Sequence, residues 1–163
     1  MKNFFVMLFC IFAFSDLFAT EQAADILLYE NNELFLATGW GHPSPLETYF
    51  LQNNIDSPFE MLSTGNYRGF IATWKICNNK LYITKIDDTK SEENRLHDIF
   101  TDIPPDKDVL AGWFSGVLQV TSERFYSENG DVYYFHIRKG VVRDSVKTNY
   151  KELTEISEKI SDG

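Results

Sequence analysis

Three pairs of short segments, each alternating apolar and polar residues and joined by an asparagine-containing dipeptide, predict three β-hairpins. They cover residues 26–36 with a turn at Asn31-Asn32, residues 70–86 with a turn at Asn78-Asn79, and residues 124–137 with a turn at Asn129-Gly130. Asparagine and glycine tolerate the left-handed backbone that two-residue hairpin turns require. The chain is therefore expected to be rich in antiparallel β-structure.

The second hairpin has a pattern that fixes its register. A turn at Asn78-Asn79 pairs Ile76 with Leu81, Lys75 with Tyr82, Trp74 with Ile83 and Thr73 with Thr84. The four large apolar side chains then share one face, whereas a slip of one residue would mix them with polar ones. This register predicts that Trp74 belongs to the core and is not a ligand platform.

Two more strands are predicted outside these hairpins. Residues 109–120 are apolar on both faces, which predicts a central, buried strand. The third hairpin is expected to continue through a bulged three-residue loop at residues 138–140 into Val141 and Val142, because Gly140 suits such a loop.

Three helices are indicated by capping boxes at residues 44–47, 89–92 and 149–152. The first two should end near Gln52 and Phe100. The last should pack on the sheet through an apolar stripe at helical spacing, formed by Tyr150, Leu153, Ile156 and Ile160. The pattern predicts one α+β domain over residues 20–163: predominantly antiparallel β, as a curled sheet or a sandwich of hairpins, with two short helices and a C-terminal helix.

Residues 1–19 have the layout of a secretory signal peptide. Lys2 supplies a positive charge, residues 4–14 form an uninterrupted apolar run, and Ala19 is a small residue at the expected cut. The run is about half of the ~20 apolar residues that a membrane-spanning helix needs. We expect a cleaved signal and a protein exported to the periplasm or secreted, without a stable membrane span after cleavage. An uncleaved N-terminal anchor is the alternative.

The acidic balance of the chain narrows its partners. A net charge of −9 disfavours nucleic acid and anionic membrane surfaces, because both are bound mainly through Lys and Arg. Cys10 lies in the predicted signal, so Cys77 would be the only cysteine left and no intramolecular disulfide is expected.

Metal-binding and cofactor-binding patterns are absent from the sequence. His42, His97 and His136 are far apart and have no second His or Cys at ligand spacing, and no glycine-rich phosphate loop occurs. We therefore expect neither a metal nor a cofactor.

Two patterns in the sequence resemble parts of catalytic sites but also have ordinary structural interpretations. The third hairpin would place Glu123 opposite His136, which suits a general base pair but is interpreted as a surface ion contact. Ser115 lies near two glycines, as in a nucleophile elbow, but one position too late for the G-x-S-x-G spacing. We therefore lean towards a protein that is not an enzyme.

Several segments, in the same order, resemble those shared by a group of small bacterial proteins. They are residues 45–50 (P-L-E-T-Y-F), 68–76 (R-G-F-I-A-T-W-K-I) and 113–118 (W-F-S-G-V-L). The resemblance spans residues 46–142. It implies a shared domain but no chemistry, because the group has no established activity. After Val120 the chain departs from the group, which tends to continue with Y-x-H-x-G-Y.

The leading functional interpretation is a non-enzymatic binding or interaction domain. Its ligand, a protein or a small molecule, would meet an aromatic surface near Trp40, Tyr67, Arg68 and Trp113, since exposed Trp and Tyr favour recognition. Arg68 would either bind a carboxylate or phosphate, or pair with one of the chain's own acids. The alternatives are an envelope-polymer hydrolase with paired carboxylates and an acidic inhibitor or immunity-type protein that neutralises a basic partner.

Overall fold

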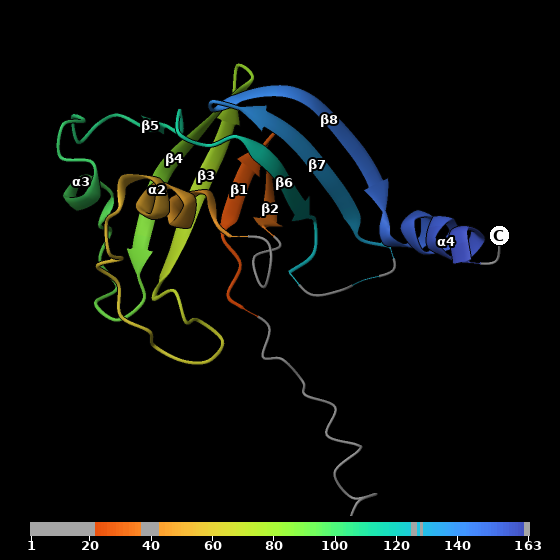
Figure 1. Cartoon of the computed structure of the whole chain (residues 1–163), viewed down its shortest axis with the longest axis horizontal. Helices are drawn as coiled ribbons and strands as arrows, with labels where there is room; N and C mark the ends of the chain where they lie inside the picture. The colour runs from red at the N-terminus through yellow and green to blue at the C-terminus, as the bar shows by residue number, and fades with distance from the viewer. Residues whose placement is uncertain (1–21, 37–42, 125–126, 128, 162–163) are drawn as a thin grey trace, which may run out of the picture.

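The computed structural model describes residues 22–36, 43–124, 127 and 129–161. Figure 1 shows a mostly β-structure with short helices at its periphery. In chain order the elements are β1 (Ile26–Tyr29), β2 (Asn32–Leu36), α2 (Pro45–Asn53), β3 (Phe70–Cys77), β4 (Lys80–Asp88), α3 (Leu96–Ile99), β5 (Val109–Leu110), β6 (Gly116–Thr121), β7 (Asp131–Arg138), β8 (Val141–Asn149) and α4 (Tyr150–Ser161).

The eight strands form one sheet that closes on itself. Seven of them follow the order β3-β1-β2-β6-β7-β8-β4, β4 pairs back onto β3, and β5 adds to β4. β1 and β3 run parallel, while the other pairs of neighbours are antiparallel. The α+β class and the mainly antiparallel character are thus confirmed. The predicted curled sheet or sandwich is not matched in detail, because the strands form a closed ring.

The β3–β4 hairpin has the predicted turn and most of the predicted register. Residues 78–79 have a left-handed backbone, with φ of 51° and 57°, and the pairs predicted for residues 74–76 are all present. Thr73, however, lies opposite Lys85. The predicted pairing with Thr84 is wrong because a bulge adds one residue to β4 at this point.

The β1–β2 turn differs from the prediction. Its two residues are Glu30 and Asn31, with φ of 48° and 64°, in place of Asn31-Asn32. Both registers put the same side chains inside, so the apolar pattern does not choose between them. The observed one continues past β1, where the Leu36 N–H donates to the Asp25 oxygen (2.8 Å).

Residues 109–120 are not one central strand, which corrects the prediction. They divide into β5 and β6 around a turn in which the Phe114 N–H donates to the Ala111 oxygen (3.0 Å). β5 adds to β4, whereas β6 lies between β2 and β7. The run reads as continuous because Ala111 and Phe114 are also buried; an apolar pattern reports burial and does not by itself report an extended backbone.

The predicted third hairpin is wrong as well. β7 pairs with β6 on one side and with β8 on the other, so no edge of β7 is left for the predicted strand at residues 124–128, of which residues 125, 126 and 128 lie outside the described residues. The Gly130 N–H donates to the Ser127 oxygen (2.9 Å), so Asn129-Gly130 does not form the predicted two-residue hairpin turn. His136 lies opposite Val117, so the predicted Glu123–His136 pair does not form.

β7 continues into β8 through a tighter turn than predicted. Lys139 and Gly140 form a two-residue turn with φ of 50° and 73°, in place of the expected three-residue loop. β8 extends to Asn149, and a register shift beside His136 and Ile137 leaves Arg143 as an extra residue.

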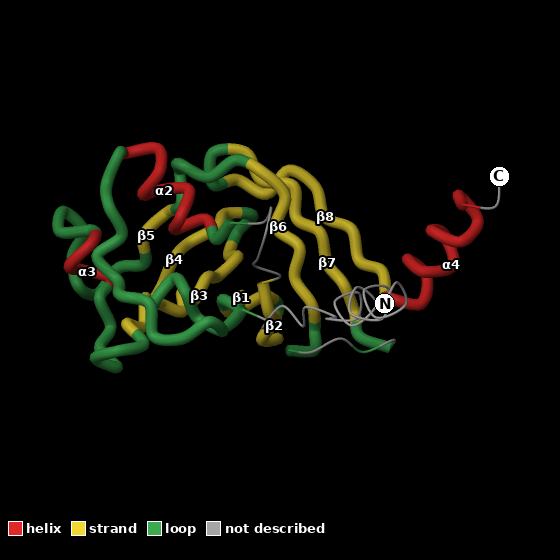
Figure 2. Tube along the Cα trace, turned by 60° about the horizontal axis from the view of Figure 1, so that its bottom comes forward, coloured by secondary structure: helices red, strands yellow, loops and turns green. Residues whose placement is uncertain are grey.

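The first and last helices begin where the capping boxes predict. The Ser44 oxygen accepts from the Leu46 N–H (3.3 Å), and the Ser44 N–H donates to Glu47 (2.8 Å). Asn149 accepts from the Glu152 N–H (2.9 Å) at the start of α4. α4 extends away from the end of β8 in both views (Figures 1 and 2), so its predicted packing on the sheet is wrong.

The predicted helix over residues 89–100 shortens to the single turn α3. No helix begins at Thr89, because the Asp88 side chain accepts hydrogen bonds from the N–H groups of Lys90 (2.8 Å) and Ser91 (3.2 Å) and stabilises a turn there. The Thr89 hydroxyl donates instead to the Gly69 oxygen (2.8 Å).

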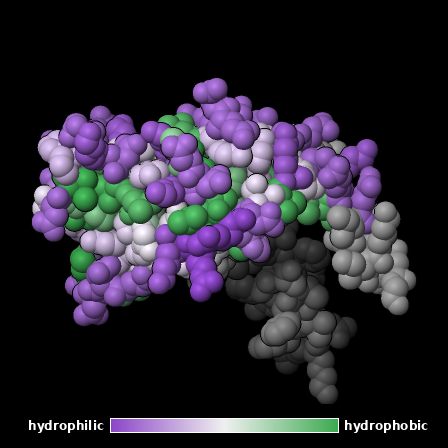
Figure 3. Space-filling model, turned by 90° about the horizontal axis from the view of Figure 1, so that it is seen from above, coloured by the Kyte–Doolittle hydropathy of each residue, from purple (hydrophilic) through white to green (hydrophobic). Residues whose placement is uncertain are grey.

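The core lies between the sheet and the segments that cover it. Trp74 is fully buried, as predicted, together with Leu27, Leu81 and Ile83. The visible face in Figure 3 intersperses hydrophobic residues with hydrophilic ones. Buried residues alternate along β3 and β4, so each of these strands contributes an inward-facing row of side chains to the core.

Candidate functional site

The structure places the four predicted binding residues in different environments. Trp40 lies outside the described residues. Tyr67 is exposed, Arg68 is buried, and Trp113 is half-buried. All three described residues contact the start of α2 or its cap, so they do gather around one helix end, but they do not form an open aromatic surface. Their binding of a ligand stays a prediction.

Arg68 forms a buried ion pair within the chain. Its Nη1 lies 3.0 Å from Asp25 Oδ1, and its Nη2 donates to the Ala23 oxygen at 2.6 Å. The guanidinium also lies over the Phe70 ring, 4.9 Å from the centroid. The side chain is 1% exposed, so the second alternative for Arg68, pairing with one of the chain's own acids, is the arrangement found.

Asp25 joins three separate segments through its two carboxylate oxygens. Oδ2 accepts from the Ser44 hydroxyl (2.6 Å) and from Trp74 Nε1 (3.1 Å). Oδ1 accepts from the Ala72 N–H (3.1 Å) and faces Arg68. A buried carboxylate with this many donors is held by polar contacts and leaves no open position for a reactant. We assign the Asp25–Arg68 pair to the fold.

Tyr67 and Glu47 lie at the outer margin of that pair. The Tyr67 hydroxyl donates to Glu47 Oε1 at 3.5 Å, and Glu47 Oε2 lies 4.0 Å from Arg68 Nη1. Partial burial, followed by the nearby Glu47 charge, raises the pKa of Tyr67. The hydroxyl therefore stays protonated at neutral pH and acts as a donor.

Trp113 packs against α2. Its indole nitrogen donates to the Pro45 oxygen (2.8 Å), and its ring stacks on Phe100 with 5.4 Å between centroids and 18° between planes. Tyr49 lies against the same ring at 4.9 Å. These contacts fix the helix on the turn between β5 and β6, so Trp113 has a structural partner on each side.

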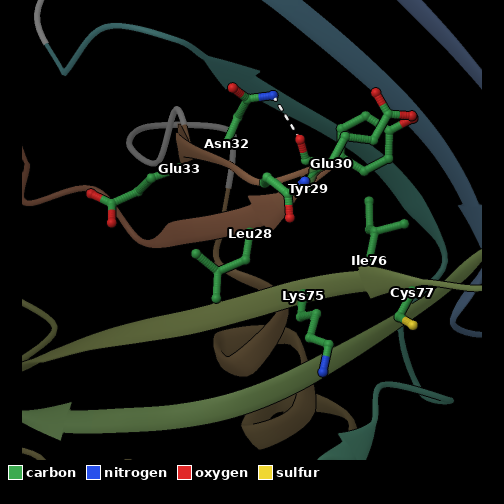
Figure 4. Close-up of a pocket in the computed structure, with 9 residues that line it drawn as sticks. Leu28, Tyr29, Glu30, Asn32, Glu33, Lys75, Ile76 and Cys77 are labelled. Atoms are coloured by element: carbon green, nitrogen blue, oxygen red, sulfur yellow. Dashed lines mark hydrogen bonds between the residues drawn. The ribbon is translucent and has the colours of Figure 1, made fainter.

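A surface cavity of about 610 Å³ lies at the β1–β2 turn and the end of β3. We call it the β1–β3 cavity. It is lined by Leu28, Tyr29, Glu30, Asn31, Asn32, Glu33, Lys75, Ile76 and Cys77. Figure 4 shows these side chains coming from the β1–β2 hairpin on one side and from β3 on the other. The parallel pairing of β1 with β3 brings the two segments together.

The cavity combines apolar side chains with two carboxylates. Tyr29, Leu28 and Ile76 supply apolar surface, and Glu30 and Glu33 supply negative charge. A hydrogen bond to Glu30, together with burial, raises the pKa of the Tyr29 hydroxyl. Neither glutamate has an ion-pair partner within the described residues.

Lys75 does not neutralise these glutamates. Its Nζ lies 3.0 Å from Asp108 Oδ2, outside the cavity lining, and the hydrogen bond to that carboxylate raises the pKa of Lys75. Cys77 is a free, exposed thiol at the end of β3. The formal charge that the lining presents to a ligand is therefore dominated by Glu30 and Glu33.

Sequence reasoning missed this cavity. The local pattern predicts the hairpins at residues 26–36 and 70–86, but nothing in it shows that β1 and β3 are parallel neighbours. Acidic residues flanking a turn are also common on ordinary surfaces. A signal existed only in the combination of Glu30, Glu33 and a neighbouring aromatic residue, which has little specificity.

The described residues also bear on metal binding, on a serine nucleophile and on membrane-spanning helices. Within it, no three His, Cys, Asp or Glu side chains are placed together as metal ligands. Ser115 precedes β6 and its hydroxyl accepts from the Lys139 N–H at 2.8 Å. Nor do the helices of the described ranges combine the length and apolar character needed to cross a membrane.

Comparison with known proteins gives no relative: no family model, no curated protein and no solved structure matches the chain.

Proposed function

We propose that the chain is an exported, non-enzymatic binding domain whose ligand site is the β1–β3 cavity. The ligand class is a cationic group on an apolar body, such as an aromatic or alkyl amine or a basic side chain of a partner. Export rests on the signal-like residues 1–19, and the binding role rests on the cavity. The observation that carries the ligand class is that Glu30 and Glu33 line a cavity together with apolar side chains and have no ion-pair partner within the described residues.

The wall and the charges suit the two parts of such a ligand. An apolar body would pack on Tyr29 and Ile76 with its ammonium group near Glu30, or on Leu28 with its ammonium group near Glu33, because Leu28 and Tyr29 lie on opposite faces of β1. An ammonium near an aromatic face gains about 0.5–1 kcal/mol when exposed, and surface ion pairs add up to ~1 kcal/mol. The net charge of −9 also attracts cations to the molecule.

A matched pair of small probes tests the proposal. Phenethylamine and 2-phenylethanol share their ring and length but differ in charge. We expect calorimetric titration to show binding of the amine and at least ~5-fold weaker binding of the alcohol, corresponding to about 1 kcal/mol. The double variant Glu30→Gln with Glu33→Gln should abolish this difference. Asp56→Asn with Asp102→Asn is the control, because it removes two exposed charges that lie outside the cavity lining and have no ion-pair partner within the described residues.

Equal affinity for amine and alcohol would reject the cationic ligand class. Retained discrimination in the Glu30→Gln, Glu33→Gln variant would place the site elsewhere. Both results are distinguishable from unfolding, because Glu30 and Glu33 are exposed and the circular dichroism of the variant should match that of the parent.

A second candidate function is hydrolysis of an envelope polymer, since two carboxylates line one cavity. Figure 4 shows the carboxylates of Glu30 and Glu33 directed away from each other. Release of reducing ends from purified peptidoglycan by the parent, and its loss in Glu30→Gln, would favour this function over simple binding.

A further inference from the structure

We propose that two copies of this chain associate by antiparallel pairing of their β8 strands about Val146. β8 has one occupied and one open edge. β7 pairs with it as far as Asn149. On the other edge, Val141 lies opposite Lys80 and the Val142 N–H donates to the Asn79 oxygen (2.9 Å). Beyond Val142, no strand of the described residues pairs with that edge.

The open part of β8 is exposed on both faces. Residues 143–147 are all exposed, although Phe135, which lies opposite Ser145 on β7, is buried. Val146, in the middle of this stretch, is 54% exposed. In Figures 1 and 2 the strand forms the outer margin of the molecule before α4 begins. An exposed edge of this kind presents unpaired backbone groups that can add another strand.

A second copy fits this edge by symmetry. The extra residue at Arg143 ends the regular edge on one side and α4 ends it on the other, which leaves residues 144–148, with Val146 at their centre. A two-fold axis through Val146 places that residue opposite itself, an apolar contact, and pairs residues 144 and 145 with residues 148 and 147 of the other copy. No like charges then lie opposite each other.

The two neighbouring registers with a two-fold axis bring like charges opposite each other. A two-fold axis at Lys147 would set two ammonium groups opposite each other, which is destabilising. An axis at Ser145 would set Asp144 opposite Val146 and Arg143 opposite Lys147. Lys147 is held within its own copy by Asp131 (2.8 Å) and lies over the Tyr133 ring, so it leaves the register at Val146 unobstructed.

Charge substitutions at the axis test this arrangement. We expect the purified protein to show a concentration-dependent dimer in sedimentation equilibrium. Val146→Lys and Val146→Glu should each weaken it at least ~10-fold, because each puts a charge opposite its own copy. An equimolar mixture of the two variants should regain the dimer, since lysine then meets glutamate. Val117→Lys, at another exposed strand valine, is the control and should leave the dimer unchanged.

Three outcomes would overturn the proposal. A parent protein that stays monomeric at millimolar concentration has no such interface. A dimer that persists unchanged in Val146→Lys uses another surface. Variants that remain monomeric when mixed, while each keeps the circular dichroism of the parent, show that residue 146 does not meet its own copy.

Discussion

Replacing Asp25 with asparagine tests the buried polar contacts that hold β1, α2 and β3 together. The substitution changes the side-chain volume little but removes the charge that faces Arg68. Oδ2 of Asp25 accepts hydrogen bonds from the Ser44 hydroxyl and from Trp74 Nε1, and Oδ1 accepts one from the Ala72 N–H. Whichever way the amide is turned, its NH₂ group faces either Trp74 Nε1 or the Ala72 N–H, and neither of these groups can accept a hydrogen bond.

The magnitude follows from the burial of the pair. Asp25 is 0% exposed and the Arg68 side chain 1% exposed. Breaking a buried pair by removing one partner costs about 3–5 kcal/mol. A domain of this size has about 5–15 kcal/mol of total stability. We therefore expect Asp25→Asn to lose about a fifth or more of the free energy of unfolding.

Urea unfolding followed by tryptophan fluorescence measures this loss. Arg68→Met should also destabilise, and the double variant should lose less than the sum of the two single losses by ~1–3 kcal/mol, because the partners interact. Asp108→Asn is the control: its pair with Lys75 is about 40% exposed and is worth at most ~1 kcal/mol. If Asp25→Asn costs no more than Asp108→Asn, the reasoning about the buried contacts is wrong.

Three further predictions concern other parts of the chain. Gly69→Ala should destabilise by about 2–4 kcal/mol in urea unfolding, because φ is +73° and an added Cβ would collide with the Glu60 oxygen, whereas Gly112→Ala, which meets open space, should stay within ~0.5 kcal/mol. Backbone N–H donors lower the pKa of Asp88. The contribution of Asp88 to the free energy of unfolding is therefore present above the unfolded pKa of ~3.9 and is lost as pH falls through the lower folded value. Urea midpoints of Asp88→Asn and of the parent should differ at pH 6 and converge below pH 3. Cys77, exposed at the cavity, should react with a disulfide reagent without unfolding, and bound phenethylamine should slow that reaction; a rate unaffected by saturating amine would contradict the proposed site.

Local chemistry was sufficient to predict the β3–β4 hairpin and two helix starts. The Asn78-Asn79 turn and the apolar alternation around it specify the same register, and Ser44 and Asn149 cap as their side-chain chemistry requires. Each of these features depends on residues within a few positions of one another. Such features can be read from a single sequence.

Features that depend on distant partners were not predictable in this way. β1 pairs in parallel with β3, which is more than forty residues away, and no local pattern indicates this neighbour. Arg68 was recognised as a charged residue entering the sheet, but its partner Asp25 precedes β1 and is not marked by any local pattern. The division of residues 109–120 was missed because buried turn residues and buried strand residues look alike.

The same limit applies to the candidate site. Glu30, Glu33 and Lys75 line one cavity only because β1 and β3 pair in parallel. Lys75 forms its ion pair with Asp108, which lies far along the chain and outside the cavity lining. Composition indicated an acidic protein suited to a basic partner. Only the fold indicates where on the molecule two acids without an ion-pair partner in the described residues line one cavity.

The most direct test of the central claim is to locate the bound amine on the molecule. Backbone ¹H–¹⁵N resonances should be recorded during titration with phenethylamine and, separately, with 2-phenylethanol. We expect saturable shifts confined to residues 28–33 and 75–77, larger with the amine than with the alcohol. Shifts centred on Tyr67 and Trp113, or none at these cavity residues, would contradict it.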